Sequence, residues 1–398
     1  MVQMLRNANE LVPSDESGSS ESGSGEEVPM AQQIRPLSLV DKLKQRTIQD
    51  FIQTHLWSKT NLSPIVVELD PTTACNLACH DCISANLLNQ GGIDDERLMR
   101  LAEEFATHGV KAVVLIGGGE PMAHKKFGAL VDALKDSRIQ VGVTTNGTMI
   151  NRYMDQSART DWLRVSVDAG STEVYADFRP HASGKSQFDL VINNMRELGK
   201  RKSGLLGYSF LLLSKYDDEG NFLRTNAVDI ERAGHLAKEI GCDYFEVKPA
   251  FDMMHFLQNP DISVVETVNK QFAAIRELAD ERFKVIAPAT LDEALGGHST
   301  QVKSYTRCLT AELRTVITPS GTYVCPYHRG NMNMRIGDVK NSSLEELWKS
   351  PKRSKVMERV NPSIHCSFHC IRHETNLLLE RMAAGETVEA VDDYDLFI

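Results

Sequence analysis

The eight cysteines of this 398-residue chain are the side chains whose type and spacing are best suited to chemistry. Seven of them fall into two groups, Cys75, Cys79 and Cys82, and Cys308, Cys325, Cys366 and Cys370. A chain of this length can bury a sizeable core without disulfide bonds, and no export signal is visible at its N-terminus. Grouped thiols in such a chain favour metal binding or redox chemistry over four disulfides.

The first group lies on one short segment, Cys75-Asn-Leu-Ala-Cys79-His-Asp-Cys82, directly after a predicted strand. Three thiols this close in sequence can converge on one site. Three thiolates leave one iron of a four-iron cluster unligated, and that iron can bind a substrate or cofactor. A zinc ion would need a fourth ligand, and His80 is available for that role. The spacing by itself favours iron–sulfur over zinc and leaves both open.

The second group can hold one further cluster. Cys308 and Cys325 are 17 positions apart, and Cys366 and Cys370 follow as a pair. Four thiols ligate such a cluster completely and leave no iron open, so we expect electron transfer there. A zinc site that uses Cys366, Cys370 and His373 stays open as an alternative. Cys242 has no partner in the sequence, and we interpret it as a buried packing thiol.

The elements that must position these thiols alternate regularly from residue 65 onward. Short β-branched runs predict strands at 65–69, 111–116, 139–144, 163–168, 205–213 and 244–247. Helical patterns occupy 94–108, 124–136, 149–158, 186–202, 226–240 and 262–282. This alternation predicts an α/β fold, a partial (β/α)6 TIM-type barrel with a parallel sheet. Ligands of such folds bind at the carboxyl ends of the strands.

The regular alternation stops near residue 288. Residues 311–318 and 321–326 predict a hairpin with Ser320 and Gly321 in its turn, and 344–358 predict a helix that Ser342 or Ser343 caps. With the cysteine pair and a last helix ending near residue 384, this region predicts a small, separate α+β module held by its cysteines.

Composition and charge exclude several classes of protein. Hydrophobic residues make up 41% of the chain and charged residues 25%, as in ordinary globular proteins. The net charge of -10 argues against nucleic-acid binding, and no apolar run approaches the length of about 18 residues that a membrane helix needs. Residues 14–27 are all Ser, Gly, Asp or Glu, which predicts disorder. We therefore expect a cytoplasmic protein.

These patterns divide the chain into four parts. They are a disordered acidic tail (1–45), the partial barrel (60–288), the cysteine module (300–384) and an acidic C-terminal tail (385–398).

The C-x3-C-x2-C spacing after the first strand resembles the signature of the radical S-adenosylmethionine (radical SAM) superfamily. The resemblance extends over about residues 60–285, because Gly117–Pro121, Thr145–Gly147 and Ser166–Gly170 are similar to family motifs at the ends of strands two, three and four. It implies that Cys75, Cys79 and Cys82 hold a [4Fe-4S] cluster whose open iron binds SAM. Reductive cleavage of SAM then yields a 5′-deoxyadenosyl radical, which abstracts hydrogen from the substrate.

The same resemblance implies the residues that contact SAM. They are Gly118, Gly119, Glu120, Pro121, Asn146, Ser166, Asp168 and Arg179. Glycine lets the backbone approach a ligand closely, and a guanidinium fork suits the SAM carboxylate. The chain departs from the family pattern at Asp81, where an aromatic residue usually precedes the third cysteine, and this puts one adenine contact in doubt.

The C-terminal cysteines resemble the twitch module, a shortened form of the SPASM extension of radical SAM enzymes. The resemblance implies that Cys308, Cys325, Cys366 and Cys370 ligate one auxiliary [4Fe-4S] cluster. The closing pair is C-x3-C here and C-x2-C in the family.

Charged residues on the apolar strands are the remaining candidates for functional residues. Glu68 and Asp70 on the first strand, and Glu246 and Lys248 on the sixth, alternate so that both members of each pair can point into the barrel. They suit substrate contact or proton transfer, or else structural ion pairs. The catalytic base stays unknown.

We expect a radical SAM enzyme that abstracts hydrogen from a small polar metabolite, such as a sugar, aminocyclitol or nucleoside. A net oxidation is favoured because the auxiliary cluster can accept an electron. A reductant such as flavodoxin or ferredoxin is implied.

The alternative is a peptide-modifying maturase, although residues 1–60 are too short and polar for an added peptide-binding domain. A third possibility, a non-enzymatic iron–sulfur electron carrier, has no need of the SAM motifs.

Overall fold

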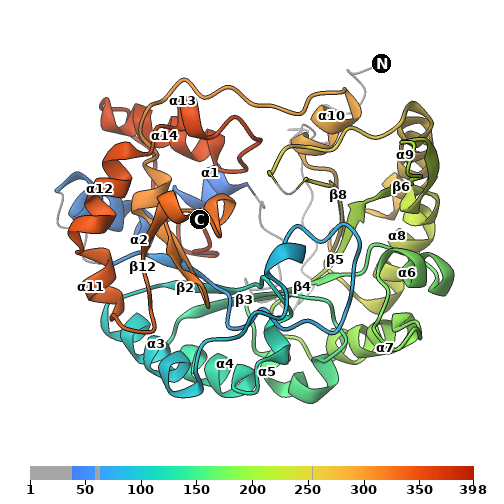
Figure 1. Ribbon diagram of the computed structural model, residues 1–398, viewed down its shortest axis with the longest axis horizontal. Coiled ribbons are helices and arrows are strands. Elements are labelled where there is room, and N and C mark those ends of the chain that lie inside the picture. Colours follow the sequence, from blue (N-terminus) through green and yellow to red (C-terminus); the bar gives the residue numbers. More distant parts are fainter. Residues whose placement is uncertain (1–37, 59–62, 253) are drawn as a thin grey trace, which may run out of the picture. The chain divides into compact units, whose positions relative to one another are not determined.

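The computed structural model describes residues 38–58, 63–252 and 254–398 (Figure 1). The predicted disordered segment 14–27 lies outside the described residues. In the described part of the chain, no helix is long and apolar enough to cross a membrane.

A parallel sheet forms the centre of the fold, in the order β1-β2-β3-β4-β5-β8. These strands are β1 (Val66–Leu69), β2 (Ala112–Leu115), β3 (Gln140–Thr145), β4 (Trp162–Ser166), β5 (Leu205–Leu212) and β8 (Tyr244–Pro249). They coincide with the six predicted strands, and β9 (Lys284–Ile286) extends the sheet beyond β8. The sheet curves without closing, so the predicted partial barrel is confirmed.

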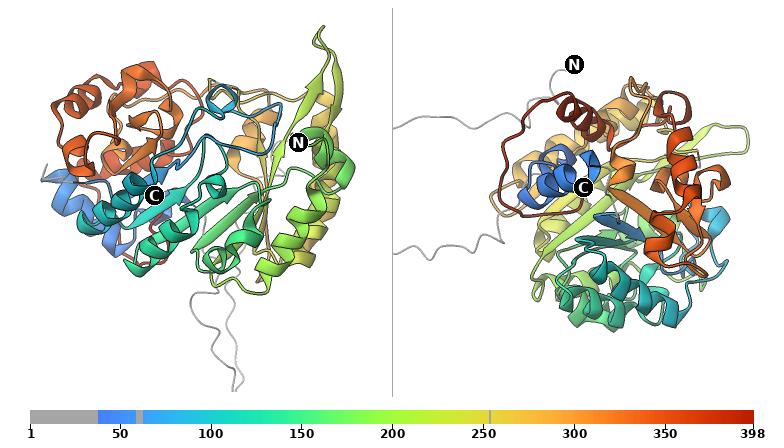
Figure 2. Two further views of the ribbon diagram at one scale, coloured as in Figure 1. Left: turned by 60° about the horizontal axis from the view of Figure 1, so that its bottom comes forward. Right: turned by 90° about the vertical axis from the view of Figure 1, so that its left-hand side faces the viewer.

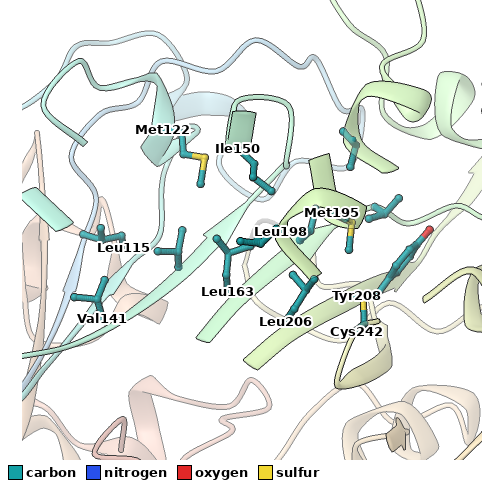
Figure 3. Packing of buried hydrophobic residues seen from close by; sticks show 14 of the residues in the cluster. Leu115, Met122, Val141, Ile150, Leu163, Met195, Leu198, Leu206, Tyr208 and Cys242 are labelled. Carbon is teal, nitrogen blue, oxygen red and sulfur yellow. The ribbon is translucent and has the colours of Figure 1, made fainter. Parts of the chain in front are cut away.

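Helices cover the outer face of this sheet (Figures 1 and 2). They are α3 (Asp95–Thr107), α4 (Phe127–Asp136), α5 (Met154–Ala158), α6 (Thr172–Phe178), α7 (Phe188–Gly199), α8 (Ile230–Ile240) and α9 (Ile262–Ile275). Outward side chains of the strands and inward side chains of the helices form the main core, in which Leu163, Leu206 and Met195 are buried (Figure 3). Cys242 belongs to this core and is 5% exposed, as expected of a packing thiol.

The cysteine module is not separate from the barrel, contrary to the sequence-based expectation. The hairpin of β10 (Arg314–Thr318) and β11 (Gly321–Tyr323) joins the sheet, and β10 pairs in parallel with β1 from Val66 opposite Arg314 to Leu69 opposite Ile317. β12 (Arg335–Gly337) pairs with β11. Without β10, the buried strand β1 would end the parallel sheet with unpaired backbone groups.

Short helices complete the C-terminal part: α10 (Ala289–Leu295), α11 (Leu344–Trp348), α12 (Pro351–Arg359), α13 (Pro362–His365) and α14 (His373–Ala383). The predicted helix 344–358 is two helices because Pro351 starts a new one, which Ser350 caps. Ser343 caps α11 in a capping box with Glu346.

Both predicted tails are partly ordered. Residues 38–45 were expected to belong to the disordered tail, but they include α1 (Leu39–Lys42), which is followed by α2 (Arg46–Phe51) and a π-helix (Ile52–Trp57). Leu396–Ile398 are buried and lie in one apolar cluster with these helices and α14. The Gln45 side chain accepts hydrogen bonds from the backbone of Tyr394 (2.6 Å) and Asp395 (2.7 Å).

This apolar cluster closes one end of the sheet's inner face. It includes Val66 and Ala112 from the amino-terminal halves of β1 and β2, and the ring of Phe397 lies 5.4 Å from that of Trp162 on β4. Apolar tail residues at 396–398 explain why this acidic segment folds back. The inner face is therefore open to ligands from the carboxyl ends of the strands.

One hairpin, which follows β5, was not predicted from the sequence. Its strands are β6 (Ser214–Tyr216) and β7 (Phe222–Thr225), and it projects away from the sheet (Figure 2). The run Asp217-Asp218-Glu219-Gly220 was the available turn signal.

Candidate active site

The first cysteine loop leaves β1 at Asp70, and hydrogen bonds from its backbone tie it to neighbouring segments. Cys75 N donates to Asn89 Oδ1 (3.3 Å), and Ala78 N donates to Pro180 O (2.8 Å). Ala74 O accepts from Glu120 N (2.8 Å), which joins the loop to the end of β2. Cys75, Cys79 and Cys82 are free thiols of intermediate exposure, so the loop presents them at the open end of the sheet.

The three thiols are close enough to influence one another. The pKa of Cys75 is raised to about 11, mainly by burial and also by the charges of Glu120, Cys79 and Cys82. Ligation to a metal centre would offset this cost, because coordinated thiols are deprotonated.

The zinc alternatives find no support among the described residues at either cysteine group. Among the described residues, no three His, Cys, Asp or Glu side chains converge tightly enough for one ion. His80, the available fourth ligand, has a side chain that is 82% exposed. A four-iron cluster spreads its ligands over the corners of a cube, so more widely spaced thiols fit it.

The glycines after β2 serve the cysteine loop directly. A Cβ on Gly119 would lie 2.4 Å from Ala74 O, so only glycine allows the loop to pass this closely. The position of Gly118 is open, since a Cβ there would lie 3.6 Å from its nearest neighbouring atom, and its N–H donates to Asp70 Oδ2 (3.1 Å). A side chain is therefore excluded by steric overlap at position 119, but not at position 118.

Glu120 fixes the ends of two strands to each other. Its buried carboxylate accepts from Thr145 Oγ1 (2.7 Å), Asn146 N (2.7 Å) and Met122 N (3.0 Å). Burial raises the pKa of Glu120, and these hydrogen bonds oppose the rise. Asn146 in turn donates to Asn76 Oδ1 (2.9 Å), and its Nδ2 lies 3.9 Å from Cys75 Sγ.

Asp168 and Arg179 form a buried ion pair beside the same loop. Asp168 has a left-handed backbone conformation (φ 58°) and accepts from Leu211 N (2.7 Å) as well as from Arg179. Burial would lower the pKa of Arg179, but Cys79, Asp168 and Tyr175 raise it. Arg179 directly precedes Pro180, whose carbonyl accepts from Ala78 N of the cysteine loop, so it lies beside Cys79. Arg179 Nε is buried and has no hydrogen-bond partner in the described structure.

Most of the residues expected to contact SAM therefore surround the cysteine loop. Gly118, Glu120 and Asn146 are hydrogen-bonded at the carboxyl ends of β2 and β3, and Gly119 lies against the loop at Ala74. Asp168 follows β4 and pairs with Arg179, next to Pro180 at the loop. Pro121 starts a buried 3-10 turn, and Ser166 lies deeper, on the inner side of β4.

The four C-terminal cysteines also form one group. The pKa of Cys308, Cys325 and Cys366 is raised to about 12 each, mainly by burial and in every case also by the charge of Cys370. Cys308 and Cys325 flank the β10–β11 hairpin, and the other two lie between α13 and α14.

His373, the expected zinc alternative, is engaged elsewhere: its Nδ1 lies 3.2 Å from the Tyr305 hydroxyl, and its ring stacks on that of Tyr305.

A buried lysine that sequence reasoning missed supports an anionic centre at this site. Lys303 is 3% exposed and donates from Nζ to Gln301 O (2.8 Å) and Phe368 O (2.5 Å). No carboxylate in the described part of the chain forms an ion pair with it. Burial lowers the pKa of Lys303, and Cys370 and Cys366 oppose this. A cluster ligated by four thiolates supplies the negative charge that a buried ammonium needs.

The charged strand residues are paired across the inner face. Glu68 on β1 is bound by Arg314 of β10 and lies 3.2 Å from Arg372 Nη2. Glu246 lies 3.6 Å from Arg164 and 3.5 Å from Lys248. The sequence analysis missed the arginines, although Arg164 on the otherwise apolar strand 163–168 was a usable signal.

Comparison with known proteins bears on both cysteine groups. The family model of the radical SAM superfamily matches residues 69–225, and the model of the SPASM iron–sulfur cluster-binding domain matches residues 308–371. Mycofactocin maturase MftC of Mycobacterium tuberculosis is 23% identical over 308 residues, which cover 72% of this chain and 71% of that protein. GTP 3',8-cyclase of Synechocystis sp. is 24% identical over 157 residues, 38% of this chain and 46% of that protein.

Two solved structures share the fold. SuiB of Streptococcus suis, bound to its precursor peptide SuiA, has a TM-score of 0.55 at 14% identity and covers 87% of this chain and 80% of its own. AnSMEcpe with bound AdoMet has a TM-score of 0.53 at 17% identity and covers 74% of this chain and 83% of its own.

Proposed function

Because this chain belongs to the radical SAM superfamily and carries a SPASM iron–sulfur domain, we propose that it is an enzyme that modifies a peptide by radical chemistry. Its cofactors are a SAM-binding [4Fe-4S] cluster, SAM and auxiliary iron–sulfur. One observation supports the peptide substrate: the similarity to a mycofactocin maturase extends over 72% of this chain.

We assign the SAM-binding cluster to Cys75, Cys79 and Cys82. When bound, cluster and SAM supply one-electron chemistry that can remove a hydrogen atom from an unactivated carbon. Around them, Gly119 and Asn146 hold the cysteine loop in place, and Asp168 orients Arg179. The unpartnered Nε of Arg179, near Cys79, is available to the SAM carboxylate. Gly118, Glu120, Pro121 and Ser166 complete the proposed SAM site.

We assign one auxiliary cluster to Cys308, Cys325, Cys366 and Cys370. All four cysteines would be ligands, so this cluster transfers electrons and does not bind substrate. Lys303 stabilises its negative charge. In this proposal residues 60–288 form the SAM-dependent part and 300–384 the auxiliary part, although the two share one sheet.

The peptide substrate replaces the small polar metabolite that the sequence favoured. That preference depended on the shortness of residues 1–60, which does not bear on a peptide bound at the open end of the sheet. The similarity to a nucleotide cyclase covers only 38% of this chain. The electron-carrier hypothesis is wrong, because the chain is a radical SAM enzyme.

The test is anaerobic reconstitution with iron and sulfide, followed by SAM, dithionite and short peptides encoded beside the gene. We expect 5'-deoxyadenosine together with a mass change in one peptide. Cys75→Ala should abolish both, whereas Cys242→Ala, which removes a buried thiol outside both groups, should retain them. Deoxyadenosine that forms only with a sugar or nucleoside would overturn the peptide substrate.

A further inference from the structure

Two cations share one carboxylate on the inner face of the sheet. Glu246 lies opposite Ser209, which lies opposite Ser166, and Lys248 lies one layer higher, opposite Leu211. Arg164 is two residues before Ser166 on the same side of β4. The three charged side chains therefore lie at successive depths below the open end of the sheet.

Neither cation is well satisfied by this carboxylate. Lys248 Nζ and Arg164 Nη1 approach the same oxygen, Glu246 Oε2, at 3.5 and 3.6 Å. Charge-assisted hydrogen bonds are about 2.8 Å long, and Lys202 reaches Asp243 at 2.6 Å in this protein. Arg164 Nε is buried without a hydrogen-bond partner, so donors remain free on the inner face.

The other carboxylates of the inner face are already occupied. Glu68 is bound by Arg314, Asp70 by Arg329, and Asp168 by Arg179. Each of them has a closer cation of its own, although Asp168 also raises the pKa of Lys248. Arg164 and Lys248 therefore share Glu246 as the one carboxylate to which an ion pair joins them among the described residues.

The two cations are reachable. Their side chains are 28% (Arg164) and 24% (Lys248) exposed, although both lie on central strands of the sheet. Burial lowers the pKa of Lys248, as expected for an ammonium with too few partners. The apolar cluster around Phe397 closes the opposite end, so a ligand arrives from the carboxyl ends of the strands, where the cysteine loop lies.

We propose that Arg164 and Lys248 form a binding site for a carboxylate of the substrate, with Glu246 holding both cations in place until it arrives. The proposal deepens the proposed function, since it selects peptides that present a carboxylate to the SAM site. A planar guanidinium beside an ammonium suits such a group. The carboxylate of SAM is the other possible source, but Arg179 lies nearer to the cysteine loop.

The test measures binding without turnover, so it is independent of the peptide-modifying activity. N-acetylglycine and its uncharged amide are titrated into the full-length, cluster-loaded protein under anaerobic conditions, with binding followed by saturation-transfer NMR. We expect the acid to bind and the amide not to bind. Arg164→Met and Lys248→Met should each weaken binding of the acid about tenfold, the loss of one charge-assisted hydrogen bond.

Glu246→Gln separates a ligand site from a structural ion pair. It removes the competing carboxylate, so the acid should bind severalfold more tightly. Lys238→Met, which removes a surface lysine paired with Asp280, is the matched control and should change nothing. The Glu246 and Lys248 variants decide the question even where Arg164→Met does not fold.

Three results would overturn the proposal. They are equal binding of acid and amide, no gain in Glu246→Gln, and a loss of SAM affinity in Lys248→Met that equals the loss for the acid. The last result would assign the cations to the cofactor. Failure to modify any peptide, with these binding results intact, would contradict only the proposed function.

Discussion

The guanidinium of Arg329 forms a two-point ion pair with Asp70. Its Nε lies 2.8 Å from Oδ2 and its Nη2 donates to Oδ1 (3.0 Å). Arg329 belongs to the auxiliary region, and Asp70 is the residue at which β1 gives way to the first cysteine loop. Asp70 also accepts from Gly118 N, so this pair joins the two cysteine sites to one strand end.

Arg329→Met should destabilise the protein strongly. It leaves the buried carboxylate of Asp70 without its partner, which costs about 3–5 kcal/mol in comparable sites. Urea denaturation of the variant measures this loss, and Arg329→Lys should recover part of it. A change below about 1 kcal/mol, as for a surface pair, would contradict the importance of the contact.

The stability of the protein should depend on the protonation of Asp70. Burial raises the pKa of Asp70 from 3.8 to about 6, so the folded state holds this proton more tightly than the unfolded state does. The stabilisation from the bound proton is present below the unfolded value and is lost as the pH rises through about 6. Relative to Asp70→Asn, the parent should lose stability between pH 4 and pH 6. Parallel curves for the two proteins would refute the raised pKa.

Gly119→Ala and Gly118→Ala should differ sharply in iron content. The added methyl group at position 119 meets Ala74 O at 2.4 Å and displaces the first cysteine loop, whereas position 118 has room. After reconstitution, the Gly119 variant should lack the irons of the first cluster and the Gly118 variant should retain them. Iron analysis and electron paramagnetic resonance measure this, and equal iron in the two variants would contradict the structural role of Gly119.

The parent should bind about eight irons, four in each cluster. Cys75→Ala and Cys308→Ala should each remove about half of them, and the double variant nearly all. Cys242→Ala is the control, since Cys242 is buried in the main core. A parent protein with only about four irons would contradict the auxiliary cluster.

A truncated protein that ends at Leu295 should aggregate. It lacks β10, so the backbone groups of β1 that pair with residues 314–317 become an open sheet edge. Light scattering and size-exclusion chromatography check this outcome. A monomeric, stably folded truncation would show that the SAM-dependent part folds without β10.

Local patterns in the sequence were sufficient for much of the fold and the site. The short β-branched runs predicted β1 to β5 and β8, and C-x3-C-x2-C identified the first cysteine loop. Each of these signals is made of residues that lie within a few positions of one another, so residue propensity and spacing reveal it. The turn at Ser320-Gly321 and the helix cap at Ser343 were also predicted from residues close together in the sequence.

The tertiary structure alone decided which distant residues meet. Val66 pairs with Arg314 and Asp70 with Arg329, partners separated by more than two hundred positions, and no periodicity encodes such a register. Glu246 likewise meets Arg164, which comes from a different strand, β4. The sequence by itself determined the elements, the two cysteine groups and the class of chemistry. Long-range packing decided that β10 completes the sheet and which charges on its inner face remain without a full partner, because burial and pairing depend on the whole chain.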